Sequence, residues 1–320
     1  MIEYRYFNFI KDKDSIASFI EIANKSYCTN TKPVEWFEYK FMSAPDGNPI
    51  IAIAHEGSKI IGSFVFSNYS FAINNKIIKS AIQYATFVDP EHRGKGIALK
   101  LLQMCETEAR NQGYSLFINF PNKISLPVFI KNNWTNASII RYYLKFFSYR
   151  KIVYFMDIRK PFCPLKSTMN NNTYDSKEIE NVLQLTDYNN NYMQSYYTYS
   201  FFYWRTNDLL SKHSTLLKKD CLIVYRVGLR GKLKEIQILG WFGKFKKLIS
   251  VINEAAKIEF ADIIGIPTSK NNPIKCSLLK NLFFKVPNST NCTFKILDGS
   301  NLENEIKNKL LIKGLDFHMY

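Results

Sequence analysis

The sequence has few of the residues that build metal centres and disulfide frameworks. Its 320 residues include six cysteines and four histidines. The cysteines stand singly, without a Cys-x-x-Cys pair or the ligand spacings typical of zinc sites. They are Cys28, Cys105, Cys163, Cys221, Cys276 and Cys292. We therefore expect reduced, mostly buried cysteines, no metal site and a cytoplasmic protein.

Long hydrophobic runs and acidic residues are also scarce. No apolar stretch is long enough to cross a bilayer, and residues 1–5 lack the start of a secretory leader. Asp and Glu number 27 against 43 Lys and Arg, which gives a formal charge of +16. The lysines are spread through a Lys-, Ile- and Asn-rich chain, so we expect neither specific nucleic-acid binding nor membrane binding.

One segment carries a continuous chemical pattern. Residues 84–88 are an apolar, aromatic and β-branched run typical of a strand. The loop Arg93-Gly94-Lys95-Gly96 follows, and apolar residues then recur at helical spacing up to Gly113, a helix-ending residue. A glycine-rich turn leading into a helix N-terminus binds phosphate well, because its exposed N–H groups point at the anion.

This segment resembles the pyrophosphate-binding motif of the GNAT acyltransferase superfamily, Arg/Gln-x-x-Gly-x-Gly/Ala. Arg93, Gly96 and Ala98 occupy its three defined positions. A second stretch, residues 122–134, is similar to the helix after the fifth GNAT strand. Asn122, Lys131 and Trp134 match there, and Asn133 stands where the family often has Gly. Asn tolerates the left-handed conformation best among non-glycine residues.

The resemblance implies that acyl-CoA is a cosubstrate and that an amine attacks its thioester directly. Backbone groups of Phe87 and Val88 would pair with the pantetheine arm, and the Val88 N–H would polarise the thioester carbonyl. The residues implied to contact the coenzyme are Phe87, Val88, Arg93, Gly94, Lys95, Gly96, Ile97, Ala98, Asn122 and Phe129.

Two departures from the family pattern concern catalysis. Phe129 stands where many GNAT enzymes carry the Tyr that protonates the leaving thiolate, so we expect core packing there. The motif strand also lacks the Glu that serves some members as general base. Gln83 or Tyr84 would have to order a water. His92 and, from the second half, Asp208 or His213 are other candidates for the base.

The order of predicted elements is the GNAT order, and the second half repeats it weakly. We expect an α/β (α+β) fold of two tandem GNAT-like domains, each a mixed, mostly antiparallel sheet flanked by helices. The first domain would span residues 1–160 and bind acyl-CoA. Residues 161–177 would be a linker. The second domain, residues 178–320, would form one wall of the acceptor site. In that second domain, Gly240-Trp241-Phe242-Gly243-Lys244 replaces the phosphate loop, so it should not bind CoA. Within these domains we expect strands at residues 139–147 and 151–158.

A tandem of this size resembles the sugar N-acyltransferases of bacterial surface-polysaccharide (O-antigen or capsule) pathways. That resemblance implies a nucleotide-linked, dTDP-type amino deoxy sugar as acceptor, an acetyl or short hydroxyacyl donor, and a monomer or homodimer. Side chains able to stack on a base or sugar, or to bind a phosphate, are Trp36, Tyr39, Tyr142, Tyr203, Trp204 and Arg205.

Two other functions fit the charge and length. One is an aminoacyl-tRNA-dependent peptidoglycan transferase of the tandem-GNAT type, although such enzymes do not use CoA and would not need the glycine loop. The other is a non-catalytic CoA- or polyanion-binding protein, which the missing Glu and Tyr allow.

Overall fold

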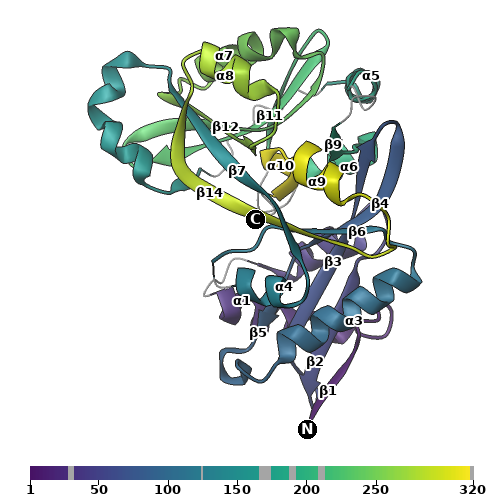
Figure 1. The fold of residues 1–320 in the computed structure, drawn as a ribbon. Coiled ribbons are helices and arrows are strands. Elements are labelled where there is room, and N and C mark those ends of the chain that lie inside the picture. The colour runs from purple at the N-terminus through teal and green to yellow at the C-terminus, as the bar shows by residue number, and fades with distance from the viewer. Residues whose placement is uncertain (28–31, 124, 166–173, 187–191, 208–212, 318–320) are drawn as a thin grey trace. The chain divides into compact units, whose positions relative to one another are not determined.

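The computed structural model describes residues 1–27, 32–123, 125–165, 174–186, 192–207 and 213–317. They form two compact units (Figure 1). Unit 1 comprises Met1–Phe71, Ile77–Asn136 and Cys292–Glu303. Unit 2 comprises Ala72–Lys76, Ala137–Asn291 and Asn304–Tyr320. Each unit has its own core and its own set of paired strands.

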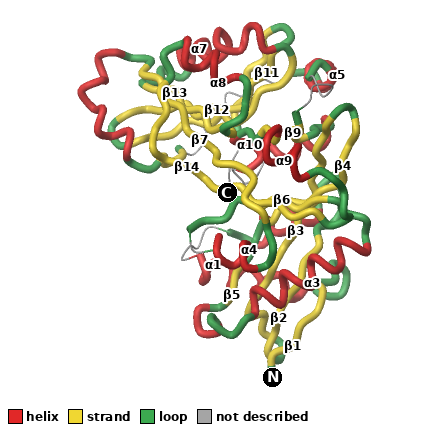
Figure 2. The backbone as a smooth tube through the Cα atoms, viewed as in Figure 1, coloured by secondary structure: helices red, strands yellow, loops and turns green. Residues whose placement is uncertain are grey.

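Unit 1 is built on a mixed sheet with the strand order β1-β2-β3-β4-β6-β14 (Figure 2). The strands are β1 (Ile2–Tyr6), β2 (Ile50–Glu56), β3 (Lys59–Ile73), β4 (Lys76–Gln83), β6 (Leu116–Asn119) and the end of β14 (Phe284–Ile296). The short strand β5 (Phe87–Val88) pairs with β3. β4 and β6 run parallel, whereas β6 and β14 are antiparallel.

Helices cover both faces of this sheet. They are α1 (Ile16–Tyr27), α2 (Val34–Phe37), α3 (Ile97–Asn111) and α4 (Leu126–Lys131). Because alternate strand residues face opposite sides, Ala52 and Ala54 of β2 pack in the core with α3, which lies across the strands in Figure 1. Phe87 of β5 instead meets Phe19 of α1 at a centroid distance of 4.9 Å. Two apolar layers therefore hold the motif strand.

Most local predictions for unit 1 are confirmed. Helix α3 buries Leu101, Leu102, Cys105 and Ala109, the residues at helical spacing. Gly113 has a φ of +73° and Asn133 a φ of +62°, so both end helices in the left-handed conformation. Of the motif strand predicted at residues 84–88, only Phe87 and Val88 are regular strand.

Unit 2 has a sheet with the strand order β7-β13-β12-β11-β10. Its strands are β7 (Thr135–Phe146), β8 (Phe162–Pro164), β9 (Met193–Ser195), β10 (Ser214–Lys218), β11 (Cys221–Arg230), β12 (Leu233–Gly243), β13 (Ile263–Ser269) and β15 (Leu310–Leu311). The helices are α5 (Ser176–Gln184), α6 (Tyr199–Thr206), α7 (Leu248–Ile258), α8 (Ile274–Lys280), α9 (Glu303–Lys309) and α10 (Gly314–Phe317). β12 and β13 run parallel and are joined through α7.

The strand predicted at residues 151–158 is wrong. Tyr149–Arg159 is a 3-10 helical segment with a kink at Tyr154. Instead of pairing along its length with a strand, this segment makes single contacts with the end of β11 and the turn that follows it. The Asp157 carboxylate accepts the Lys232 N–H at 2.8 Å, and Arg230 donates to the Lys160 carbonyl at 2.7 Å. The apolar side chains that suggested a strand, such as Val153 at 77% exposure, lie at the surface.

The two units are interleaved along the sequence. The division falls inside β7, between residues 136 and 137, and again inside β14, between residues 291 and 292. Unit 1 therefore needs a segment that lies almost 160 residues further along the chain, and residues 162–164 of the expected linker are strand β8, which pairs with β11. The domain boundary predicted at residue 160 does not coincide with this division.

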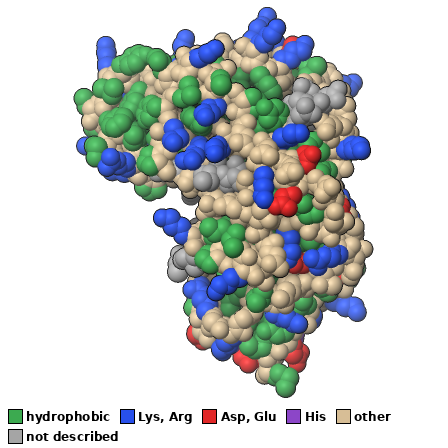
Figure 3. Space-filling model, in the orientation of Figure 1, with side chains coloured by type: hydrophobic (Ala, Val, Ile, Leu, Met, Phe, Trp, Pro, Cys, Tyr) green, Lys and Arg blue, Asp and Glu red, His purple; other side chains and the backbone are tan. Residues whose placement is uncertain are grey.

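Cysteines and charges are distributed as follows. Cys105, Cys221 and Cys292 are buried, Cys163 and Cys276 are exposed, and Cys28 lies outside the described residues. Figure 3 shows Lys and Arg side chains scattered over the visible face, with few acidic ones between them. None of the described helices combines the length and apolar character required to span a bilayer.

Candidate functional site

A pocket of 310 Å³ opens in unit 1 between the glycine loop, the start of α3 and helix α4. All the residues around it belong to unit 1. They are Val88, His92, Arg93, Gly94, Gly96, Ile97, Ala98, Leu99, Val128, Lys131 and Asn132. The structure thus brings the loop predicted to bind phosphate and the helix of the second motif to one site.

The loop has the conformation that an anion cradle requires. Gly94 and Gly96 have φ values of +78° and +76°, and a Cβ on either would meet no atom within 4 Å. Gly96 is the N-cap of the 15-residue helix α3, and residues 93–96 are exposed. The first N–H groups of α3 have no partner within the helix, and bare glycines let an anion approach them. The residues present therefore fit a diphosphate.

A buried carboxylate holds the segment just before the loop. Asp89 is 0% exposed, and its side chain accepts the N–H of Glu91 at 3.2 Å. Lys25 of α1 lies 2.9 Å from one carboxylate oxygen, and Lys59 lies 3.7 Å from the other. Burial alone would raise the pKa of Asp89, but the hydrogen bonds from Lys25 and Glu91 hold that pKa below its ordinary value. Asp89 is therefore a charged anchor for the loop.

Arg93 connects the glycine loop to two neighbouring elements through hydrogen bonds. Its Nε donates to the Val88 carbonyl at 3.3 Å, and its Nη2 donates to the Ser26 carbonyl, also at 3.3 Å. One planar guanidinium thus joins the loop to β5 and to α1. The sequence motif predicted direct contact with phosphate for Arg93. The structure adds a positioning role that the motif does not reveal.

Helix α4 forms the opposite wall. Val128, Lys131 and Asn132 line the pocket, at helical spacing on one side of α4. Phe129 lies on the other side, is 4% exposed and packs edge-on against Trp134 at 5.0 Å. It is therefore in the core, as the missing hydroxyl suggested. It is not among the lining residues, so its predicted contact with the coenzyme stays a prediction. Of these three lining residues, the sequence analysis singled out Lys131 alone, although the same helical spacing would have identified Val128 and Asn132.

Asn122 shapes this wall indirectly. Its Oδ1 accepts the Ser125 N–H at 2.9 Å and the Ser125 hydroxyl at 3.1 Å, which closes the turn before α4. Phe87, Lys95 and Asn122 are not among the lining residues. Phe87 is buried against α1, and Lys95 is exposed on the loop. Their predicted contacts with a coenzyme stay predictions.

The motif strand loses one of its two partners as it nears the pocket, since β4 lies between β3 and β6. β4 pairs with β6 at Ser80–Ile82. Beyond that point the Tyr84 N–H donates to Val65 and the Asp89 N–H donates to Ile61, both on β3. The chain from Tyr84 to Asp89 thus follows β3, and Val88 reaches the pocket at its end.

The ionisable side chains that line the pocket are all basic. Arg93, Lys131 and His92 line it, and no Asp or Glu is among the lining residues that the structure describes. His92 Nε2 lies 3.4 Å from Glu56 Oε2, and this hydrogen bond holds the pKa of Glu56 below its ordinary value. The site is therefore suited to a polyanion.

The proposed catalytic side chains do not line the pocket. Tyr84 is 3% exposed, lies nearly parallel to Trp36 with 6.1 Å between ring centroids, and meets Phe41 at 5.7 Å. Gln83 Nε2 donates to Thr86 Oγ1 at 2.6 Å. Their catalytic roles remain predictions, whereas His92, the other candidate base of unit 1, is among the lining residues.

The predicted acceptor contacts fall in both units. In unit 1, Trp36 is buried and Tyr39 half-buried. In unit 2, Tyr142 is half-buried and Tyr203 is 56% exposed, whereas Trp204 and Arg205 are buried. Arg205 donates to the Leu315 carbonyl at 2.7 Å, so its guanidinium already takes part in a buried hydrogen bond within unit 2. Of the alternative bases, His213 is buried and Asp208 lies outside the described residues.

The corresponding segment of unit 2 is not a loop. Residues 240–243 continue strand β12, and Gly243 has a φ of +81°. A Cβ on Gly243 would collide with the Asp220 carbonyl. This glycine thus serves close packing and leaves no space for an anion.

Comparison with known proteins connects this geometry to a family. Residues 10–136 match the model described as an acetyltransferase (GNAT) domain. This range includes the glycine loop, α3, β6 and α4. This segment is therefore similar to GNAT acetyltransferase domains, a class of acyltransferase that uses acyl-CoA as cosubstrate. A comparison of the whole sequence with curated proteins gives no match.

Solved structures similar to this chain extend over both units. A GCN5-related N-acetyltransferase from Anabaena variabilis has a TM-score of 0.67 at 12% identity, with 93% of this chain and 73% of that chain covered. One from Kribbella flavida has a TM-score of 0.64 at 12% identity, covering 93% and 72%. Eis1 from Mycobacterium abscessus has a TM-score of 0.61 at 11% identity, covering 93% and 74%. The predicted fold class, mixed sheets flanked by helices in a GNAT-like arrangement, is confirmed.

Proposed function

We propose that this chain is an acyl-CoA-dependent N-acyltransferase whose coenzyme site is the unit 1 pocket. The single observation that carries the proposal is the left-handed glycine loop at the start of α3, open to solvent and lined by cationic side chains. It lies within the segment that matches the GNAT acetyltransferase domain.

In this proposal the residues of the pocket bind and orient the donor. N–H groups of residues 94–98 hold the diphosphate, and Lys131 adds a positive charge opposite them. Acyl-CoA supplies an activated acyl group as its thioester. The N–H of Val88 polarises the thioester carbonyl, and much of the rate comes from holding donor and acceptor amine together. The amine loses its proton to water, to His92 or to a base outside the pocket, since no described lining residue is a carboxylate.

We further propose a nucleotide-linked, dTDP-type amino deoxy sugar as acceptor, with acetyl as donor group or a short hydroxyacyl group in its place. The formal charge of +16 favours a phosphorylated acceptor. The exposed ring of Tyr203 is able to stack on a base or a sugar. A bacterial enzyme of surface-polysaccharide synthesis, active as a monomer or homodimer, would have these properties.

Coenzyme binding is the first test, and Gly96→Val is the decisive variant. The added side chain would project into the space that the diphosphate needs. We expect CoA affinity to fall by about 10- to 100-fold, because each lost hydrogen bond to a charged group contributes about 1.5–3 kcal/mol. The matched control is Gly113→Val at the other end of α3, where φ is +73° and a Cβ also meets nothing within 4 Å.

Calorimetry with CoA, together with far-UV circular dichroism of both variants, measures this difference. A folded Gly96→Val protein that binds CoA as tightly as the parent chain would refute the site. Equal losses in both variants would mean that backbone strain, not anion contact, is responsible.

The acceptor is tested separately. Purified protein is incubated with acetyl- or hydroxyacyl-CoA and a panel of dTDP-linked amino sugars, and release of free thiol is followed. Turnover only with aminoacyl-tRNA, without CoA binding, would assign the peptidoglycan transferase function. CoA binding without turnover of any amine, with binding to random RNA that falls steeply as salt increases, would indicate a polyanion-binding protein.

A further inference from the structure

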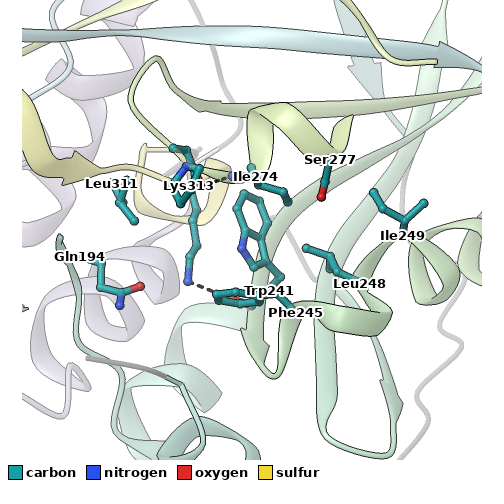
Figure 4. Close-up of a pocket in the computed structure, with 11 residues that line it drawn as sticks. Gln194, Trp241, Phe245, Leu248, Ile249, Ile274, Ser277, Leu311 and Lys313 are labelled. Carbon is teal, nitrogen blue, oxygen red and sulfur yellow. Dashed lines mark hydrogen bonds between the residues drawn. The ribbon is translucent and has the colours of Figure 1, made fainter. Parts of the chain in front are cut away.

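Unit 2 contains a second pocket, of 230 Å³, that the proposed acyl transfer does not use (Figure 4). Its lining residues come from β9, the end of β12, α7 and α8 with the residues just before each helix, and β15 with the segment after it. They are Gln194, Trp241, Phe245, Leu248, Ile249, Asn272, Pro273, Ile274, Ser277, Leu311 and Lys313. All lie in unit 2.

This pocket holds the same place in its unit as the glycine-loop pocket in unit 1. There, the wall is formed by the end of β5, the start of α3 and helix α4. Here, β12, α7 and α8 supply the corresponding elements in the same order. The lining is different, because side chains replace the glycine loop. The second pocket therefore has the position of a ligand site but lacks a phosphate cradle.

Lys313 is the charged group of the pocket and is 4% exposed. Its Nζ donates to the Trp241 carbonyl at 2.9 Å, as Figure 4 shows, and lies 4.7 Å from the centroid of Phe242. An ammonium group has three N–H donors, and the carbonyl accepts only one of them.

The charge of Lys313 has no carboxylate directly against it among the described residues. Asp316 is the charged group that acts on it, but the carboxylate of Asp316 accepts the backbone N–H of Lys313 at 2.7 Å and the Tyr197 hydroxyl at 3.0 Å. Burial lowers the pKa of Lys313 to about 8, and Asp316 opposes this only in part. A buried cation of this kind is costly unless an anion accompanies it.

The rest of the pocket is mostly apolar. Trp241, Leu248 and Leu311 are buried walls, and Ile249 and Ile274 are half-buried. Asn272 is already engaged, since it donates to Thr268 at 2.8 Å and accepts the Ile274 N–H at 3.1 Å. Phe245, at the start of α7, is 45% exposed. No Asp or Glu is among the described lining residues, so an anionic ligand meets no repulsive charge in the lining.

We propose that this pocket binds a small apolar monocarboxylate, with its carboxylate on the Lys313 ammonium and its hydrocarbon part against Trp241, Leu248 and Ile274. The volume supports a ligand of this size, because an apolar cavity of about 150 Å³ holds benzene. A carboxylate would accept the N–H donors that Trp241 leaves available. The proposal is independent of the acyltransferase assignment and needs no coenzyme.

Binding of matched probes to the full chain tests the proposal. At pH 7, hexanoate and hexan-1-ol, or phenylacetate and 2-phenylethanol, are titrated while calorimetry or tryptophan fluorescence is followed. We expect each carboxylate to bind about 10-fold or more tightly than its alcohol, because a charged hydrogen bond is the difference between them. Lys313→Met should abolish that preference, whereas Lys246→Met, on the exposed turn before α7, should leave it unchanged.

Two further measurements keep the test decisive. Ile274→Trp fills the pocket and leaves Lys313 in place, so it should abolish binding even if Lys313→Met does not fold. Carboxylate affinity should also fall above about pH 8, as Lys313 in the free protein loses its proton. The proposal is overturned if the alcohols bind as tightly as the acids, if neither binds the folded chain, if Ile274→Trp has no effect, or if affinity is the same at pH 7 and pH 9.5.

Discussion

The two pockets occupy equivalent places in units 1 and 2 but are lined by opposite kinds of chemistry. In unit 1 the segment between strand and helix is a glycine loop, and backbone N–H groups face the pocket. In unit 2 the strand continues to Gly243, and the side chains of Trp241 and Phe245 occupy the corresponding region. The same scaffold thus presents main chain in one unit and side chains in the other. The composition of this short connection decides which ligand a unit is able to hold.

Glycine itself has a different role in each unit. Gly96 leaves space for a ligand, since a Cβ there meets nothing within 4 Å. Gly243 leaves no space, since a Cβ there would strike the Asp220 carbonyl and approach Val182. Both residues have positive φ, so the backbone angle does not distinguish them. Only the surroundings show that one glycine is functional and the other structural.

The largest effect should come from removing the distant segment of unit 1. A fragment of residues 1–160 lacks Cys292–Glu303, and therefore the β14 strand that pairs with β6. Leu116, Phe117 and Ile118 of β6 are each 0% exposed and would lie on an open sheet edge. We expect this fragment to be unfolded or aggregated and to bind no CoA, as measured by circular dichroism and calorimetry. A soluble, CoA-binding fragment would show that unit 1 is complete without its distant strand.

Alanine at the two glycines should separate their roles. Gly243→Ala should lower the free energy of unfolding by about 2–5 kcal/mol, from left-handed strain of about 1–2 kcal/mol plus overpacking. Gly96→Ala should lower it by only about 1–2 kcal/mol, because strain acts alone. Urea unfolding of both variants measures the difference. Equal losses would contradict the contrast between an open and a closed glycine.

Restoring the family hydroxyl at Phe129 should have an intermediate effect. Phe129→Tyr places a hydroxyl in the apolar core beside Phe64 and Trp134. We expect the free energy of unfolding to fall by about 1–3 kcal/mol, the cost of burying an unsatisfied polar group. Val128→Thr, on the pocket side of α4, is the control and should change stability little. A faster acyl transfer by Phe129→Tyr would instead mean that the hydroxyl reaches the site.

The smallest change concerns the brace formed by Arg93. Lysine has one ammonium and does not bridge the Val88 and Ser26 carbonyls as the guanidinium does. Arg93→Lys should therefore weaken CoA binding by roughly 3- to 10-fold, since net hydrogen bonds contribute about 0.5–1.5 kcal/mol each. If Arg93 acted only through its charge, Arg93→Lys would bind CoA normally. Lys95→Arg serves as the control on the same loop.

The elements around the unit 1 pocket could be predicted because their signals are local. Helix α3 follows from apolar spacing, its end from Gly113, and the left-handed Asn133 from the preferences of asparagine. The bracing by Arg93 and the burial of Phe129 depend on contacts with α1 and with Trp134, which no motif contains.

The predictions that failed, or that could not be made, depend on distant partners. Residues 151–158 have β-type composition but pair with no strand. Asp157 instead bonds to Lys232, 75 residues away in the sequence, and the nearby Lys160 carbonyl bonds to Arg230, 70 residues away. The exchange of β7 and β14 between units joins segments that lie far apart in the sequence. Lys313 likewise reaches the second pocket from near the C-terminus, without a pattern that links it to Trp241.

The interleaving of the strands has a consequence for how the protein is made on the ribosome. The last residues of β6 leave the exit tunnel long before Cys292 is translated, and β14 is the strand that covers their edge. At about 5–20 residues per second the interval is on the order of 10 s. During that interval the nascent chain displays an apolar strand with one open edge, which nearby polypeptides are able to join. The need for chaperones should therefore last until β14 has left the ribosome and paired with β6.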